Sequence, residues 1–420
     1  MRLRSIQIKH LARVEGEGGL AVRLYASGKV TPQFRITEAP RLFEGILLGR
    51  SFNELPDITA RICGICPVAH QLSAAAAVER VCGTAVDCTV DSLRRLLLCA
   101  EWLESHALHV ILLHAPDFCG VAGGLQVGEQ DPAALQHGLA LKKLGNAIVT
   151  RVGGREIHPV NVRVGGFHRL PRRSELAPLI EALQKGLESA LAIARWTAGF
   201  DYPDFEKDYE FVSLRSPNGY PMISDRLVSS GGLDAGIEDY GRYVKIMQVH
   251  YSTALQHIRR DGAPFAVGPL ARFNINSDRL SPLARRAAFE NGLAAPCRNP
   301  FKSILVRAVE MVHACETALE LLTRSEDFDR PAAFPVPRNG KGCGAVEAPR
   351  GLLLHRYALD DNGLVREARI FTPTAMNQAT IEEDLKAVFE RFGDLPRERL
   401  SRLLEQAVRN YDPCISCATH

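Results

Sequence analysis

The sequence lacks an excess of charge of either sign. Its 420 residues include 51 lysines and arginines against 48 aspartates and glutamates, a net charge of +3. No stretch concentrates the basic residues, so we expect no nucleic-acid partner. The sequence also has no Pro/Gly/Ser-rich linker, internal repeat or low-complexity tract, which predicts one large domain over residues 1–420.

A membrane span and an export signal are lacking as well. The most apolar long stretch, from Leu96 to Ala115, is interrupted by glutamates and histidines, so we expect it to be a buried helix. The first residues, MRLRSIQIKHLARVEGEG, contain no uninterrupted apolar segment and no small-residue cleavage site. We therefore expect a cytoplasmic protein, unless a partner subunit carries an export signal.

A disulfide framework is not expected either. The sequence has eleven cysteines, an odd number, and no export signal. Seven of them are isolated, most in apolar surroundings, where a free cysteine packs as a small hydrophobic side chain. These packing cysteines are Cys82, Cys88, Cys99, Cys119, Cys297, Cys315 and Cys343.

Periodicity predicts a mainly α protein with small β parts. Residues 2–35 alternate apolar and polar side chains around a Gly-rich centre, as a β-hairpin at a sheet edge does, and the Gly/Pro-rich segments 151–166 and 337–357 indicate loops with short strands. We expect a helical body over 36–335, between an N-terminal β region (1–35) and a C-terminal region (336–420). The predicted helices cover 69–81, 92–114, 174–195, 237–259, 280–291, 302–323, 381–391 and 396–409.

The remaining four cysteines form two CxxC pairs, Cys63/Cys66 and Cys414/Cys417. A two-residue spacer lets both sulfurs of a pair reach one metal. Zinc fingers and ribbons place their pairs roughly 12 to 20 residues apart, whereas these pairs lie at opposite ends of the chain. From spacing alone, structural zinc, an iron-sulfur cluster and a nickel or mixed-metal centre all remain open. A redox CxxC is disfavoured because no small α/β unit surrounds either pair.

Two nucleotide-binding motifs are not supported. The segment GKGCG at 340–344 is not followed by the GK[ST] of a phosphate-binding loop. No GxGxxG follows a predicted strand, so no dinucleotide-binding unit is expected in this chain.

Four motifs with many characteristic residues narrow the choice among these metal centres. They are Arg13-Val14-Glu15-Gly16, RICGICPVAH at 61–70, EAPRGLLLH at 347–355 and DPCISCATH at 412–420, with GGREIHPVNVRVGG at 153–166 between them. Together and in this order they resemble the signature motifs of the nickel-iron hydrogenase large subunit. The resemblance implies a central bundle of long helices with a peripheral N-terminal β-sheet, and the reversible oxidation of dihydrogen to protons and electrons.

Carried over by motif, the resemblance implies a nickel-iron centre held by the four cysteines. Cys63 and Cys414 would be terminal nickel ligands, while Cys66 and Cys417 would bridge nickel to an iron that carries cyanide and carbon monoxide. Soft thiolates keep nickel electron-rich with an open position for dihydrogen.

The resemblance also implies that Glu15 takes the place of the base that accepts the proton, and a carboxylate can serve as such a base once burial raises its pKa. In isolation, the RVEG tetrapeptide would instead suggest a surface carboxylate paired with Arg13. The motif context reverses that reading.

The resemblance places further residues around the two metals. Arg350 and Pro349 would face the open position, with Asp412 orienting the arginine. Thr374 would donate a hydrogen bond to a cyanide, and His70 would contact a bridging sulfur, although a satisfied core histidine is the plainer reading of His70 alone.

A second metal, magnesium or iron, would be held near the C-terminus by Glu44, His420 and a backbone carbonyl near Gln378. The sequence departs from the family near Arg350: where the respiratory branch has an acidic residue, this sequence has Ser105, which alters the charge around the arginine. The surrounding segment 103–118, LESHALHVILLHAPDF, is similar to the corresponding segment in the cytoplasmic bidirectional branch of the family.

The resemblance also implies partners. No other cysteines have cluster-binding spacing, so iron-sulfur clusters are expected on a separate small subunit, and flavin and NAD(P) on further diaphorase-type subunits. Two alternatives remain at this point: a scaffold of the complex I type that has lost metal thiolates, and a zinc-stapled scaffold without hydrogenase activity.

Overall fold

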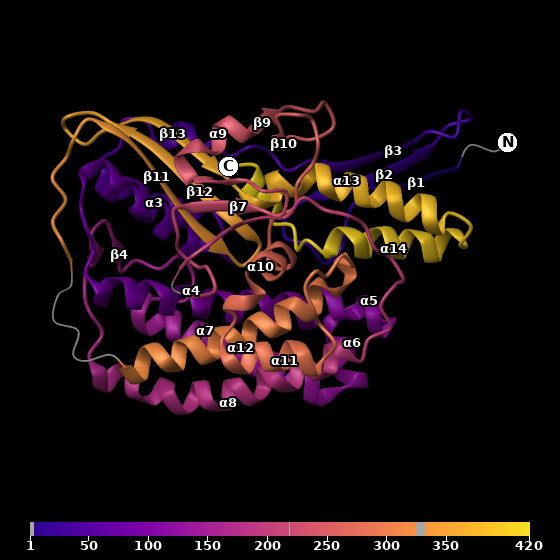
Figure 1. Ribbon diagram of the computed structural model, residues 1–420, viewed down its shortest axis with the longest axis horizontal. Coiled ribbons are helices and arrows are strands. Elements are labelled where there is room, and N and C mark those ends of the chain that lie inside the picture. The colour runs from indigo at the N-terminus through magenta and orange to yellow at the C-terminus, as the bar shows by residue number, and fades with distance from the viewer. Residues whose placement is uncertain (1–3, 218, 325–331) are drawn as a thin grey trace.

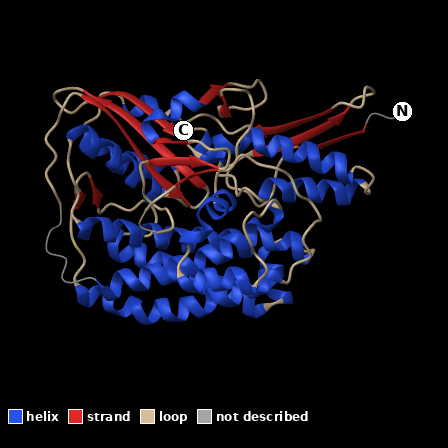
Figure 2. Ribbon diagram, in the orientation of Figure 1, coloured by secondary structure: helices blue, strands red, loops and turns tan. Residues whose placement is uncertain are grey.

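The computed structural model describes residues 4–217, 219–324 and 332–420. A layer of long helices lies below a layer of β-sheets and shorter helices (Figure 2). The prediction of a mainly α protein with small β parts is confirmed. Residues 1–3 of the predicted N-terminal β region, and residues 218 and 325–331 of the predicted helical body, lie outside the described residues. The assignment of one domain over the whole chain stays a prediction.

Four long helices form the body of the molecule (Figure 1): α4 (Cys88–Leu108), α7 (Pro132–Gly153), α8 (Arg173–Ala198) and α12 (Ser303–Arg324). Helix α4 packs on α7 and α12, and α8 packs on the same two helices. Leu179 and Leu183 of α8 are buried, as their four-residue spacing predicts. Helix α7 was not predicted. Its Gly145 lets it approach α4 closely, because a Cβ there would lie 2.6 Å from the Ala100 carbonyl oxygen.

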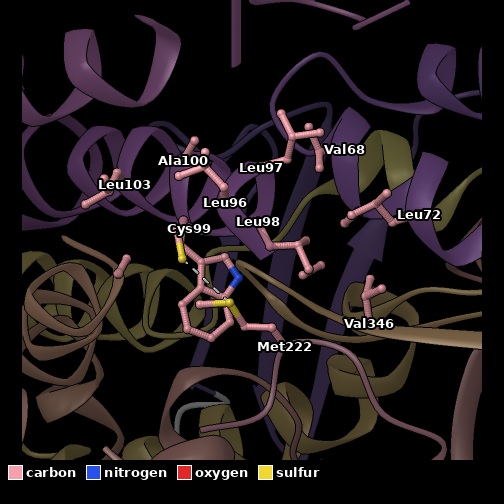
Figure 3. Packing of buried hydrophobic residues seen from close by; sticks show 14 of the residues in the cluster. Val68, Leu72, Leu96, Leu97, Leu98, Cys99, Ala100, Leu103, Met222 and Val346 are labelled. Atoms are coloured by element: carbon pink, nitrogen blue, oxygen red, sulfur yellow. Dashed lines mark hydrogen bonds between the residues drawn. The ribbon is translucent and has the colours of Figure 1, made fainter. Parts of the chain in front are cut away.

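Helix α4 is buried on several sides, since α3 (Pro67–Cys82) also packs on it. Figure 3 shows three consecutive buried leucines of α4 among apolar side chains from α3 and from strand β11 (Gly340–Ala348). The Cys99 thiol lies 3.8 Å from the Met222 sulfur. A fully buried leucine contributes about 2 kcal/mol. The residues in this part of the core include Val68, Leu72, Leu96, Leu97, Leu98, Leu103 and Val346.

The helical path continues beyond α4 through a wider π-helical turn (His109–His114) into α5 (Ala115–Cys119). The stretch Cys88–Cys119 is long and apolar enough to cross a membrane by length and composition, but 83% of its most apolar window is buried inside this chain. The sequence-based reading of a buried helix agrees with this position.

The N-terminal sheet has three antiparallel strands rather than the expected hairpin: β1 (Arg4–Ile8), β2 (Gly18–Leu24) and β3 (Val30–Ile36). It extends to one side of the molecule and packs on α13 (Pro373–Phe392) and α14 (Arg397–Arg409) (Figure 1). The predicted N-terminal β-sheet is confirmed, and the expected hairpin gains a third strand because the segment 4–8 pairs with β2.

A second three-stranded antiparallel sheet lies on α3: β11 (Gly340–Ala348), β12 (Gly351–Leu359) and β13 (Val365–Phe371). The prediction of loops with short strands over 337–357 was therefore wrong. The glycines that suggested a loop serve packing, because a Cβ on Gly342 or Gly344 would lie 2.3 Å from a backbone oxygen of α3.

The predicted helix 237–259 was wrong as well. The segment forms a short 3-10 turn (Ile237–Asp239), α9 (Tyr240–Tyr243) and the hairpin β9 (Val244–Met247) and β10 (Gln256–Arg259). The apolar residues of this segment follow a helical spacing, which favoured a helix in the prediction. In the structure the pairing of β9 with β10 overrides this local preference. The remaining elements are α1 (Phe43–Leu47), α2 (Leu55–Thr59), β4 (Val162–Arg163), β5 (Gly166–Phe167), β6 (Val212–Leu214), β7 (Arg226–Ser229), β8 (Asp234–Gly236), α6 (Gly124–Gln130), α10 (Pro269–Asn276), α11 (Pro282–Glu290) and α15 (Ile415–Ala418).

All eleven cysteines are free, as expected for thiols. Of the seven assigned to packing, five are buried and Cys119 is half-buried. Cys88 is exposed, so its packing assignment was wrong: it begins α4, where the first helical turn still faces solvent.

The end of the chain returns to the middle of the molecule. After α14 the last residues pass beside the N-terminal segment, and Figure 1 marks the C-terminus next to β12. The Arg41 amide donates to the Thr419 carbonyl at 2.8 Å, which ties the tail to the segment before α1. This return brings the two CxxC pairs together.

Candidate metal centre

The first pair lies on a tight loop between a 3-10 turn (Ala60–Ile62) and the start of α3. Pro67 is the first residue of α3, so the helix begins directly after Cys66. The Cys63 sulfur accepts hydrogen bonds from the Ile65 and Cys66 amides, both at 3.3 Å. Backbone amides aimed at sulfur stabilise a thiolate.

The second pair lies on the short helix α15, with Cys414 just before its first residue and Cys417 inside it. The Cys414 amide donates to the Thr374 hydroxyl oxygen at 2.8 Å, and the Ile415 amide donates to the Glu15 carbonyl at 3.1 Å. The tail is therefore fixed from two sides before it presents its sulfurs.

The four sulfurs form one buried cluster. Cys63 lies 3.5 Å from Cys414, Cys66 lies 3.5 Å from Cys417, and all four sulfur atoms are within 4.8 Å of one another. Sulfurs bound tetrahedrally at about 2.3 Å from a metal are roughly 3.8 Å apart, so the spacing fits a thiolate-bound metal site.

Electrostatics point the same way. Hydrogen bonds from neighbouring thiols, Cys414 foremost, hold the pKa of Cys63 well below its usual value, while burial foremost raises the pKa of Cys417. The four thiols cannot all ionise to thiolates in one buried cluster unless cations offset the repulsion between the negative charges. The cluster is therefore suited to positively charged metal ions.

Glu15 lies beside this cluster. Its carboxylate accepts hydrogen bonds from the Ser416 hydroxyl at 2.5 Å and the Ser416 amide at 3.1 Å. Burial and then the charge of Cys414 raise the pKa of Glu15 to about 7. Arg13 does not pair with it but with Asp117, at 2.5 Å, so the reading of Glu15 as a surface carboxylate paired with Arg13 is wrong.

Arg350 enters from the turn between β11 and β12. Its Nε donates to the Asp412 carbonyl at 2.8 Å and its Nη2 to the Asp412 carboxylate at 3.2 Å, while Nη1 is buried without a partner in the described residues. Burial alone would raise the pKa of Asp412, but the positive charge of Arg350 and the contact with His109 at 3.0 Å hold it well below its usual value. Pro349 precedes Arg350 in the same turn.

The comparisons with known proteins decide which metal chemistry this cluster serves. The sequence profile of the nickel-dependent hydrogenases matches residues 41–155 and 250–420, a range that contains all four cysteines. This chain belongs to the nickel-dependent hydrogenase family. It is a hydrogenase large subunit, and the zinc-stapled and complex I-like alternatives are not supported.

Relatives of the hydrogenase align along nearly its whole length. Sulfhydrogenase 1 subunit alpha of Pyrococcus furiosus is 35% identical over 430 residues, which cover 99% of this chain and 97% of the relative. The beta subunit of the NAD-reducing hydrogenase HoxS of Cupriavidus necator is 28% identical, covering 99% and 95%. A crystal structure of an NAD+-reducing [NiFe]-hydrogenase in the H2-reduced state superposes with a TM-score of 0.88 at 28% identity, covering 99% of both chains.

Two further residues of the expected site have defined contacts in the hydrogenase. Thr374, in the first turn of α13, accepts the hydrogen bond from Cys414 described above. His70 shares a 3.1 Å hydrogen bond with His355, which in turn contacts the Tyr357 hydroxyl at 2.7 Å. Burial lowers the pKa of His70 to about 3, so its ring is neutral.

The residues expected at the second metal are only partly assembled. The His420 Nε2 lies 3.8 Å from the Glu44 carboxylate, which also accepts from the Ile370 amide at 2.8 Å. The Gln378 side chain is engaged elsewhere, donating to the Leu255 carbonyl at 2.7 Å. Burial opposes ionisation, but the contacts to His420 and Ile370 lower the pKa of Glu44, so it offers an anionic ligand.

Sequence reasoning missed several residues that shape the site. Ser416 is only the spacer of a CxxC pair in sequence, and its contact with Glu15 has no local signal. His109 lies 3.0 Å from the Asp412 carboxylate, and Arg272 donates to the Pro349 carbonyl at 3.0 Å from behind the turn. These contacts join segments far apart in the chain, so periodicity and spacing could not reveal them.

Proposed function

We propose that this chain is the catalytic subunit of a reversible, NAD(P)-linked nickel-iron hydrogenase. The observation that carries the proposal is the meeting of two CxxC pairs from opposite ends of the chain beside the half-buried carboxylate of Glu15. Cys63 and Cys414 would be terminal nickel ligands, and Cys66 and Cys417 would bridge nickel to iron.

When bound, such a centre supplies an open metal position at which dihydrogen is split into two protons and two electrons. Glu15 would take up a proton there. A carboxylate with a pKa of about 7 can both accept and release a proton near neutral pH. The two hydrogen bonds from Ser416 fix the carboxylate's orientation next to Cys414.

The iron would carry cyanide and carbon monoxide, and several buried groups suit such ligands. The Arg350 Nη1 group is buried and has no partner in the part of the chain that the structure describes, so it can donate to a ligand, and the Asp412 contacts hold the guanidinium in place. Thr374 uses only its oxygen toward Cys414, so its proton remains available to a cyanide nitrogen. Pro349 would line the same apolar pocket, and His70, neutral and buried, would support a bridging sulfur.

A magnesium or iron ion would bind between Glu44 and His420, with water and a main-chain carbonyl near Gln378 completing its ligands. The 3.8 Å between the two side chains leaves them close enough to share one cation after small movements.

A small subunit with iron-sulfur clusters would receive the electrons. Support comes from an exposed apolar group on and beside α1, where Leu42, Ile46 and Leu48 are 68%, 46% and 52% exposed. This group, here the α1 patch, adjoins the metal loop, since Arg41 donates to the Ile62 carbonyl at 2.7 Å. Apolar surface of this kind indicates a protein interface.

Flavin and NAD(P) would be bound by further diaphorase-type subunits. Support comes from the similarity to NAD-reducing hydrogenases in sequence and in structure. A soluble, cytoplasmic complex follows from that similarity, because nicotinamide nucleotides are soluble carriers.

Metal analysis and infrared spectroscopy of the purified complex test the proposal. We expect about one nickel per chain, together with iron, and bands of iron-bound cyanide and carbon monoxide. Zinc as the only metal, without these bands, would refute it. NAD(P) reduction by dihydrogen tests the acceptor separately, and a complex active only with artificial dyes would exclude the nucleotide link while leaving the metal assignment intact.

A further inference from the structure

Asp117, in α5, is bound by two arginines from opposite ends of the chain. Its carboxylate accepts from Arg13 Nη2 at 2.5 Å, and from Arg409 Nε and Nη2 at 2.6 and 2.8 Å. The side chains of Asp117 and Arg409 are 6% and 1% exposed, so that pair is nearly buried, while Arg13 at 16% lies at the edge of solvent. We call Arg13, Asp117 and Arg409 the Asp117 clamp.

The clamp also holds backbone. Arg13 Nη1 donates to the Leu113 carbonyl at 2.7 Å, and Arg409 Nη1 donates to the Ala12 carbonyl at 3.0 Å. The N-terminal segment at residues 12–13 and the end of α14 are therefore tied directly to each other and to α5. Charge-assisted bonds with two contacts per arginine fix direction as well as distance.

Each segment changes direction next to the clamp. Arg13 itself has φ of 62°, and Asp412, three residues after Arg409, has φ of 48°. Residues other than glycine adopt this left-handed conformation only where surrounding contacts enforce it. The contacts of the clamp supply that enforcement for Arg13.

Beyond these turns the two segments meet at the metal cluster. Ile415 donates to the Glu15 carbonyl at 3.1 Å, and Ser416 binds the Glu15 carboxylate twice. Glu15 is two residues from Arg13, and Cys414 is five from Arg409. Short segments anchored at a common point leave little freedom in the distance between the carboxylate and the sulfur.

We propose that Asp117 is a positioning residue for proton transfer: through Arg13 and Arg409 it sets the placement of Glu15 against Cys414. The inference rests on the proposed role of Glu15 as proton acceptor. Replacing the carboxylate by an amide leaves Arg13 without a counter-charge among the described residues and Arg409 with only its 3.2 Å contact to Glu405, so the segments carrying the two guanidinium groups separate. A displacement of about 1 Å is enough to slow a proton transfer strongly.

A purely structural ion pair offers a matched control. Glu79 in α3 accepts from Arg94 at 2.5 and 2.8 Å, and both side chains are as buried as those of Asp117 and Arg409. Glu79 lies thirteen residues beyond Cys66, roughly 20 Å along the helix. Glu79→Gln therefore removes a comparable charge without touching the segments that carry Glu15 and Cys414.

We expect the Asp117→Asn variant to fold, because its surroundings are open to water. Arg13, Asp117 and Arg409 border a cavity of about 400 Å³ at the surface, so water can reach the arginines when the carboxylate is neutralised. Arg13→Lys is a milder second variant, because it keeps the positive charge and gives up the two-point contact.

The test compares Asp117→Asn, Arg13→Lys and Glu79→Gln in the intact hydrogenase complex. Nickel and iron content, cyanide and carbon monoxide bands, and deuterium exchange between D2 and water are measured for each. We expect Asp117→Asn to keep the metals and the infrared bands while its rate of deuterium exchange falls tenfold or more. The exchange rate of Arg13→Lys should fall three- to tenfold. The exchange rate of Glu79→Gln should stay within twofold of the parent.

Three outcomes would overturn the proposal: exchange within twofold of the parent in Asp117→Asn, an equal loss in Glu79→Gln, or loss of the metals in both clamp variants. The Glu15→Gln variant distinguishes failure of the proposed base from failure of the positioning role of Asp117. If that variant exchanges normally, the proposed base is wrong. If it is inactive while Asp117→Asn is normal, only the positioning role fails.

Discussion

Cys63 and Cys414 are 351 positions apart in the sequence, and their sulfurs are 3.5 Å apart. Because the first pair follows the N-terminal region and the second ends the chain, the cluster forms only when both ends of the protein have folded. Metal binding at this cluster therefore also stabilises the folded state, since an unfolded chain holds the two pairs far apart.

Removing the acid function of Glu15 should separate proton transfer from metal binding. Glu15→Gln keeps the side-chain size and can still accept from Ser416, but it cannot take up a proton. We expect isotope exchange with water to fall by about 10² to 10⁴, as for loss of a general base, while nickel and iron remain. Unchanged dihydrogen-deuterium exchange would remove Glu15 from this role.

The geometry of Arg350, rather than its charge alone, should matter. In Arg350→Lys the positive charge remains, but the paired contacts to Asp412 are lost. We expect dihydrogen oxidation to fall about 100-fold, comparable to the loss of one positioned donor in an active site. Arg94→Lys, in the distant pair with Glu79, is the control, and equal losses in both variants would speak against a specific role for Arg350.

The α1 patch should be needed for the small subunit. Leu42 has φ of 55° and is 68% exposed, so Leu42→Asp adds a charge to the patch in a conformation that aspartate accepts more readily than leucine. We expect the small subunit to be lost on purification while the large subunit stays folded. Phe289→Asp, at an 84% exposed site on α11, should leave the complex intact. Equal recovery of the small subunit from both variants would contradict the assignment.

Buried histidines should make the hydrogenase sensitive to acid. Burial lowers the pKa of His313 to about 4, against about 6.5 in an unfolded chain, so the fold favours its neutral form. Its stabilising effect is complete above pH 6.5 and is lost as the pH falls toward 4. The shift corresponds to at most about 3 kcal/mol.

Thermal midpoints between pH 7.5 and 4 measure this effect. We expect His313→Gln to be less stable than the parent at pH 7.5, because the ring accepts from the Ser281 amide, but to lose less on acidification. The exposed His250→Gln should follow the parent curve. A parent and a His313→Gln variant with parallel curves would exclude His313 as a source of the acid sensitivity.

The sequence could predict the elements whose signal is local. The leucine spacing of α8 gave that helix, and four motifs gave the two CxxC pairs and Glu15, because each lies within a few adjacent residues. Local patterns gave wrong predictions where a residue type serves a packing role that differs from its usual one. Gly342 and Gly344 suggested a loop, whereas they allow a strand to lie against α3.

By itself, then, the sequence determined the helical character of the body and the set of thiols available to a metal. Only the tertiary structure decided that Ser416 binds Glu15 and that Asp117 joins Arg13 to Arg409, across separations of 104 and 292 residues. The physical reason is that a helix follows from periodic side chains along one segment. A contact between distant segments depends on the path of all the chain between them.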